Sequence, residues 1–132
     1  MAAASNFLEN ALLNHTLTTT GYTQPTTRFL ALFTADTGLE ANSPSAEISA
    51  SGTAYTRKAV TFAAASGGTC ATNATVTFDT ATASWGLVSH IAIMDNSTGG
   101  NVLFYGALTT SKQIDAADTM QVTSGNLTVS LA

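Results

Sequence analysis

The sequence predicts a mainly β protein: an antiparallel β-sandwich or partly closed barrel of six to seven strands, with one amphipathic N-terminal helix in front. Three observations favour this class. Short apolar runs recur after position 25, and turn residues separate them. Threonine, a β-branched residue that favours strands, is the commonest polar residue. Only one stretch has helical spacing. We expect a helix or arm over 1–20 and a β-sandwich domain over 21–132.

The helix is expected over residues 5–17, SNFLENALLNHTL. Asn6 can cap its N-terminus, with Glu9 three residues later as in a capping box. His15 lies in the last turn, where the negative end of a helix favours a cation. Glycine, proline and β-branched residues in 18–25 end the helix. The apolar residues recur at helical spacing and form one stripe: Phe7, Leu8, Ala11, Leu12 and Leu13.

The strands follow in order. Segment 27–34 is mostly apolar, so we expect it to be buried on much of both faces. The segments HIAIMD and NVLFYGALT flank the Gly99-Gly100 turn and are the best hairpin candidate. The polar loop 35–52 is expected at the surface. Further strands are expected within 54–62, 74–78, the end of 111–122, and 126–131.

Charged residues are scarce: they make up 9% of the chain, against about 25% in an ordinary domain. Such a surface suits a protein that packs against copies of itself or a partner. The basic residues are too few to bind nucleic acid, which needs clustered lysine and arginine; they are Arg28, Arg57, Lys58 and Lys112. The longest apolar run, FLALF, is far shorter than the roughly 20 residues that cross a bilayer. We expect neither nucleic acid nor membrane as a partner.

Cys70 is the single cysteine, which excludes an internal disulfide and a cysteine-based zinc site. Its neighbours, SGGTCATNA, are typical of a turn, so a surface thiol is expected. The first residues, MAAAS, lack the basic and apolar regions of a signal peptide. These features predict folding in a reducing cytoplasm.

The stretch from 78 to 100 holds the residues that most resemble a catalytic set. A Ser–His–Asp site needs its three side chains within hydrogen-bond reach. Ser89 and His90 are adjacent on an expected strand, so alternation predicts that they point to opposite faces and do not pair. Asp95 lies at the strand end. We therefore expect His90 to be a half-buried strand residue and Trp85 to be an anchor of the core.

Asp115 and Asp118 are the remaining acid pair of interest. They could contribute to a calcium site, but no further oxygen ligands stand in line, which favours a solvated pair. The chain has no phosphate loop and no Gly-x-Ser-x-Gly elbow. The sequence therefore predicts a protein that is not an enzyme, with no catalytic residue, no cofactor-binding residue, no metal ligand and no cofactor.

Five pieces of the chain carry a family resemblance and cover nearly all of it: NFLENALLNHTL, GYTQPTTRFLALFT, YTRKAVTFAAASGG, VTFDTATASWGLVSHIAIMDNSTGGNVLFYGALTTSK and LTVSLA. Their order resembles a family of small virion proteins of tailed bacteriophages, labelled tail-fibre-like or decoration proteins. The most specific piece is ATASWGLVSHIAIMDNSTGGNVLFYGAL, by its spacing of Trp85-Gly86, His90, Asp95, Gly99-Gly100 and Gly106.

The resemblance implies a structural part of the virion, assembled in the host cytoplasm, with no catalytic residues. Two functions are open. The favoured one is a capsid decoration (cement) protein that clamps neighbouring copies of the major capsid protein. The alternative is a tail or tail-fibre component that adapts or attaches to the host surface, with tail proteins as partners. In either case we expect a homo-oligomer, and the symmetric junctions of a capsid lattice favour a trimer.

Overall fold

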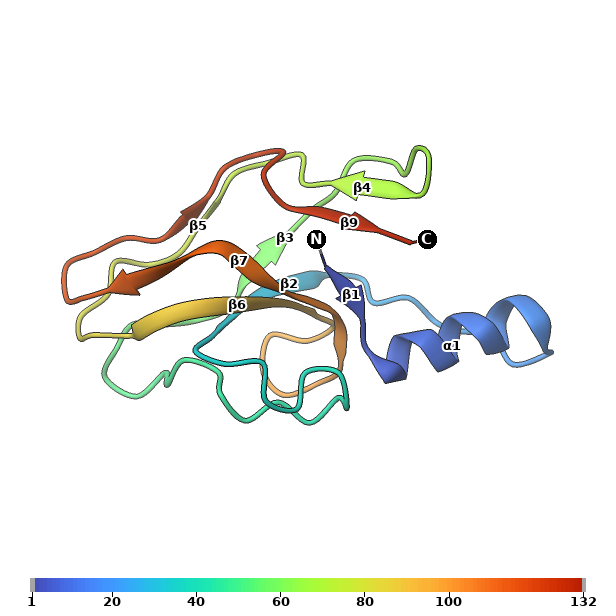
Figure 1. Ribbon diagram of the computed structural model, residues 1–132, viewed down its shortest axis with the longest axis horizontal. Helices are drawn as coiled ribbons and strands as arrows, with labels where there is room; N and C mark the ends of the chain where they lie inside the picture. Colours follow the sequence, from blue (N-terminus) through green and yellow to red (C-terminus); the bar gives the residue numbers. More distant parts are fainter. Residues whose placement is uncertain (1, 132) are drawn as a thin grey trace.

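The computed structural model describes residues 2–131 as two β layers with a helix projecting at one end (Figure 1). The larger layer is an antiparallel sheet of five strands in the order β1-β7-β6-β2-β3. The other layer contains two two-stranded sheets, β4-β9 and β5-β8. The mainly β class with one N-terminal helix is confirmed, and the five-stranded sheet is open rather than closed into a barrel.

The strand bounds are β1 (Ala3–Ala4), β2 (Arg28–Phe33), β3 (Lys58–Val60), β4 (Thr69–Ala71), β5 (Val76–Thr77), β6 (Gly86–Met94), β7 (Val102–Ile114), β8 (Gln121–Val122) and β9 (Thr128–Ser130). This is more than the six to seven strands expected. Several of the additional or shortened strands have only two or three residues, too few for an alternating pattern to mark them.

The hairpin of β6 and β7 is confirmed and forms the centre of the large sheet, with Ile91 opposite Gly106 and Ile93 opposite Phe104. Its connection needs glycine at position 100, where φ is +72° and a Cβ would lie 2.4 Å from Oδ1 of Asp95. The sequence pattern therefore located both the strands and the turn correctly.

Strand β2 is buried on both faces, as its apolar sequence predicts. Leu30 and Leu32 belong to the main core between the layers. Ala31 and Phe33 point to the outer face, where Leu39 covers them. Leu39 is fully buried, so part of the loop 35–52 is a cover for the sheet. The expectation that this loop lies at the surface was wrong at Leu39 and at Ile48, because both apolar side chains are buried in the clusters on the two faces of the sheet.

Trp85 is an anchor of the core, as predicted, with 5% of its surface exposed. Its indole N–H donates to the carbonyl of Thr53 at 2.8 Å. The rings of Tyr55 and Phe78 meet it edge to face, with centroids 5.5 and 6.4 Å away. Burial of the ring together with a partner for its only polar atom makes the indole a stabilising element of the core.

Helix α1 (Asn6–Leu17) is capped by Ser5 rather than by Asn6. The Ser5 hydroxyl accepts from the N–H of Leu8 at 3.2 Å and donates to the carbonyl of Val102 on β7. Ser5 is fully buried, so the predicted cap was wrong by one residue. The cap is decided by contact with a strand almost a hundred residues away, which a local pattern does not reveal.

The predicted apolar stripe of α1 is buried at one end only. Leu8 is 4% exposed, and Phe7 and Leu12 pack against the core from half-buried positions. Leu13, the last residue of the stripe, is 55% exposed, and Leu17, one turn beyond the stripe, is 77% exposed. Figure 1 shows the outer half of α1 extending beyond both β layers. The first half of the helix thus anchors it, and the second half presents leucines at the surface.

His15 lies in the last turn of α1, as predicted. Its Nδ1 accepts a hydrogen bond from the N–H of Tyr22 at 3.0 Å. His15 thus holds the segment that returns from the helix towards the body of the protein.

Candidate docking groove

Ser89 and His90 are in hydrogen-bond contact, with Oγ and Nδ1 2.8 Å apart. The prediction that they do not pair was wrong. The β6–β7 ladder is interrupted at Ser89: Val88 pairs with Lys112, whereas His90 pairs with Ala107. Such a bulge breaks the alternation of side chains, so two successive residues can approach each other.

The donor and acceptor roles in this pair differ from those of a catalytic serine and histidine. The Ser89 hydroxyl donates to the carbonyl of Thr34 at 2.8 Å. A hydroxyl has one proton, so Oγ accepts from Nδ1–H of His90. A catalytic histidine must instead accept the serine proton. The pair joins β6 to the residue that follows β2.

Asp95 serves the hairpin turn rather than His90. Its Oδ1 accepts from the backbone N–H of Asn101 at 2.6 Å, and its Oδ2 accepts from the Asn101 side-chain amide at 2.9 Å. Both carboxylate oxygens therefore bind within the turn. The three residues singled out in the sequence do not converge on one site.

Asp115 and Asp118 also form a turn. Oδ2 of Asp118 accepts from the backbone N–H of Asp115 at 2.9 Å. Oδ1 of Asp115 accepts from the side chain of Gln113 at 3.0 Å. Among residues 2–131, no group of three or more histidine, cysteine, aspartate or glutamate side chains is placed to hold a metal ion.

Arg57 forms the main polar cluster, which the sequence analysis missed. Its guanidinium binds both carboxylate oxygens of Glu47, at 2.7 and 2.8 Å, and the carbonyls of Asn96 and Gly99, at 2.9 and 2.8 Å. The Tyr55 hydroxyl donates to the same carboxylate at 2.7 Å. Hydrogen bonding to Glu47 raises the pKa of Arg57. The cluster ties the hairpin turn to the segment 47–57 and leaves little of the guanidinium free for a ligand.

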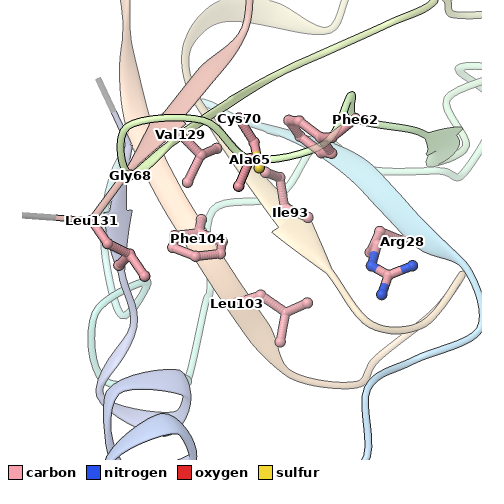
Figure 2. A pocket seen from close by; sticks show the side chains of 10 residues that line it. All are labelled: Arg28, Phe62, Ala65, Gly68, Cys70, Ile93, Leu103, Phe104, Val129 and Leu131. Carbon is pink, nitrogen blue, oxygen red and sulfur yellow. The ribbon is translucent and has the colours of Figure 1, made fainter.

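An apolar groove of about 310 Å³ opens between the two layers, and Figure 2 shows the side chains that line it. Ile93, Leu103 and Val129 form part of its walls and are almost wholly buried. Leu131 is 57% exposed. The complete lining is Arg28, Phe62, Ala65, Gly68, Cys70, Ile93, Leu103, Phe104, Val129 and Leu131. The small β4-β9 sheet faces the large sheet across this opening.

Arg28 is the one charged side chain in the lining of this groove. Its Nη2 donates to Oε1 of Gln24 at 2.8 Å. A guanidinium has five N–H donors, so this bond leaves donors for a further partner. The groove thus combines apolar walls with one cation, a composition that fits an apolar partner carrying negative charge.

Cys70 lines the groove from β4, opposite Val129. The prediction that Cys70 lies in a turn was wrong, because the turn at Gly67-Gly68 ends just before it and the strand begins at Thr69. Cys70 is half-buried and unpaired. Sequence reasoning missed the groove because its residues come from several separate segments, and no local motif marks them.

Within residues 2–131, no helix combines the length and the apolar character needed to cross a membrane.

The chain is 132 residues long, and residues 3–130 match the family model described as podophage GP4 fiber I protein gp80. No curated protein matches the chain. The family match begins at β1 and ends at β9, so it includes α1, both β layers and every groove residue except Leu131. The chain belongs to the family of podophage GP4 fiber I protein gp80, a family of small, fibre-like structural proteins of the phage virion.

Proposed function

We propose that this virion protein is a tail-fibre component that works through contacts with copies of itself and with neighbouring tail proteins. The observation that carries the proposal is the match of residues 3–130 to a family described by a fibre protein. The sequence favoured capsid decoration instead. That function finds no support in the family description, and it stays a prediction that the experiment below separates from a tail position.

The surface supports an assembly role. Only 9% of the residues are charged, and Leu13 and Leu17 of α1 are exposed. The apolar groove opens beside β1, the strand that leads into α1 (Figure 2). Apolar surface that is exposed in a free chain is typical of protein contacts. In this proposal the subunits are made and assembled in the host cytoplasm, and neither nucleic acid nor membrane is a partner.

The proposal includes no catalytic activity. The Ser89–His90 pair has its protons arranged for a structural bond, and Asp95 is engaged in the hairpin turn. The binding of the fibre to a host surface would therefore depend on shape and contact and not on cleavage. The trimer expected from the sequence stays a prediction.

The copy number of the chain in purified particles tests the proposed location. Quantitative mass spectrometry, with the major capsid protein of the same particle as internal standard, gives the ratio of the two chains. A tail-fibre component is expected at a copy number far below that of the major capsid protein. If the ratio gives a copy number equal to that of the junctions in the capsid lattice, it would establish decoration and contradict the proposal.

A further inference from the structure

The outer half of α1 presents an apolar face that the rest of the described chain leaves exposed. Leu13 and Leu17 are one helical turn apart, so they lie on the same side of the helix. They are 55% and 77% exposed. The inner half of α1 is held by the Ser5 cap and by burial of Leu8, which directs the outer half away from the β layers (Figure 1).

The end of α1 and the groove are complementary in charge as well as in polarity. Helix α1 contains no lysine or arginine, and the C-terminal end of a helix carries a partial negative charge. The groove has apolar walls, and Arg28 is its one charged side chain. Leucines would meet the apolar walls while the negative helix end faces the guanidinium.

We propose that the outer half of α1 docks in the groove of a second copy of this chain. The helix and the groove lie at the same end of the molecule (Figures 1 and 2), so neighbouring copies can present one to the other. In this contact one copy supplies the helix and the other supplies the groove. Such contacts form either a reciprocal dimer or a closed ring. The inference deepens the proposed function, since it gives a fibre subunit its contact with other copies.

Cys70 provides a direct test because it is the single cysteine of the chain and lines the groove. The Leu17→Cys variant is prepared in isotope-labelled and unlabelled form, mixed, and treated with a short bis-maleimide. We expect covalent species that join position 17 of one isotope to Cys70 of the other. Leu87→Cys is the matched control, because Leu87 is 51% exposed on β6 and does not line the groove.

Two results of the cross-linking overturn the proposal. In the first, position 17 is cross-linked to Cys70 only within chains of the same isotope, which would place α1 in the groove of its own chain. The other is equal cross-linking of Leu17→Cys and Leu87→Cys.

Light scattering and thiol alkylation provide a second test that needs no new cysteine. We expect the Leu13→Ser/Leu17→Ser variant to lose the assembled species and its Cys70 to react faster with maleimide. Both leucines are exposed, so circular dichroism should show an unchanged fold. Leu87→Ser should behave as wild type. A wild-type chain that is monomeric at every concentration would contradict the contact between α1 and the groove of a second copy, but not the proposed tail location. A copy number that matches the capsid lattice would contradict the proposed tail-fibre function, but not this contact.

Discussion

Nη2 of Arg57 lies 2.7 Å from Oε1 of Glu47, in an ion pair whose arginine side chain is only 6% exposed. The same guanidinium reaches the carbonyls of Asn96 and Gly99 in the hairpin turn. One side chain therefore fixes two segments that are far apart in sequence. Because the partners are separated by irregular distances along the chain, composition and periodicity give no sign of this contact.

Replacement of Arg57 should destabilise the fold strongly. Arg57→Met leaves the partly buried Glu47 carboxylate without its cation, and we expect a loss of about 3 kcal/mol in the free energy of unfolding. Lys58→Met is the control, because the Lys58–Asp79 pair is more exposed, at 29% and 56%, and should contribute less than about 1 kcal/mol. Urea denaturation measures both. Equal losses would show that Arg57 contributes no more than a surface charge.

The two glycines of the hairpin turn should differ in their tolerance of alanine. A Cβ at Gly100 would lie 2.4 Å from Oδ1 of Asp95 and 2.7 Å from Cβ of Asn96, whereas a Cβ at Gly99 meets nothing within 4 Å. Both have positive φ, so Gly99→Ala should cost about 1–2 kcal/mol from backbone conformation alone. Gly100→Ala should cost more, measured by thermal unfolding. A similar melting temperature for the two variants would contradict the geometry of the turn.

Trp85→Ala should remove much of the stability of the protein. Truncation of a buried aromatic residue costs about 3–5 kcal/mol, a large share of the roughly 5–15 kcal/mol of a small domain. Trp85→Phe keeps a ring in the core but loses the bond to the Thr53 carbonyl, so its loss should be smaller. An alanine variant that melts within a few degrees of wild type would be inconsistent with the core described above.

The stability of the protein should fall in alkali. Burial raises the pKa of Tyr55 above the ordinary tyrosine value of 10.0. The folded state therefore retains a proton that the unfolded state releases, so this contribution is complete below pH 10.0 and declines as pH rises beyond it. Denaturation at pH values on both sides of this point measures the change. Tyr55→Phe should show a weaker decline; an unchanged decline would assign the effect to other groups.

Replacement of His90 should affect stability and not activity. His90→Ala removes the bond between Nδ1 and the Ser89 hydroxyl and should cost about 1 kcal/mol. Ser89→Ala removes the same bond, and the double variant should cost less than the sum because the two residues are in contact. Assays on host polysaccharides should give no product with wild type. Turnover that disappears in His90→Ala would contradict the structural role of the pair.

The sequence predicted the features that depend on local pattern. The buried β2, the β6–β7 hairpin, its glycine turn and the burial of Trp85 follow from apolar runs, turn residues and side-chain size. It could not predict features that depend on contacts between distant segments. The Ser5 cap depends on Val102, and the Ser89–His90 bond depends on a bulge set by pairing with β7.

The groove also depends on contacts between distant segments, so the sequence could not predict it. Its walls join β2, β4, β6, β7 and β9, so it exists only once both layers are placed. Phe62 and Phe104 are apolar residues that any core would accept, and in sequence they do not differ from the residues of the main cluster. The sequence also provided no sign that Leu13 is exposed, because the apolar stripe from Phe7 to Leu13 is continuous in sequence and the structure buries only part of it.

Electron microscopy of intact particles, labelled with antibodies against this chain and gold, tests the central claim most directly. The family match and the proposed fibre role predict gold at the tail, with capsids bare. Particles disrupted to separate heads from tails should retain the label in the tail fraction. Label distributed regularly over the capsid surface would contradict the account and establish the decoration role.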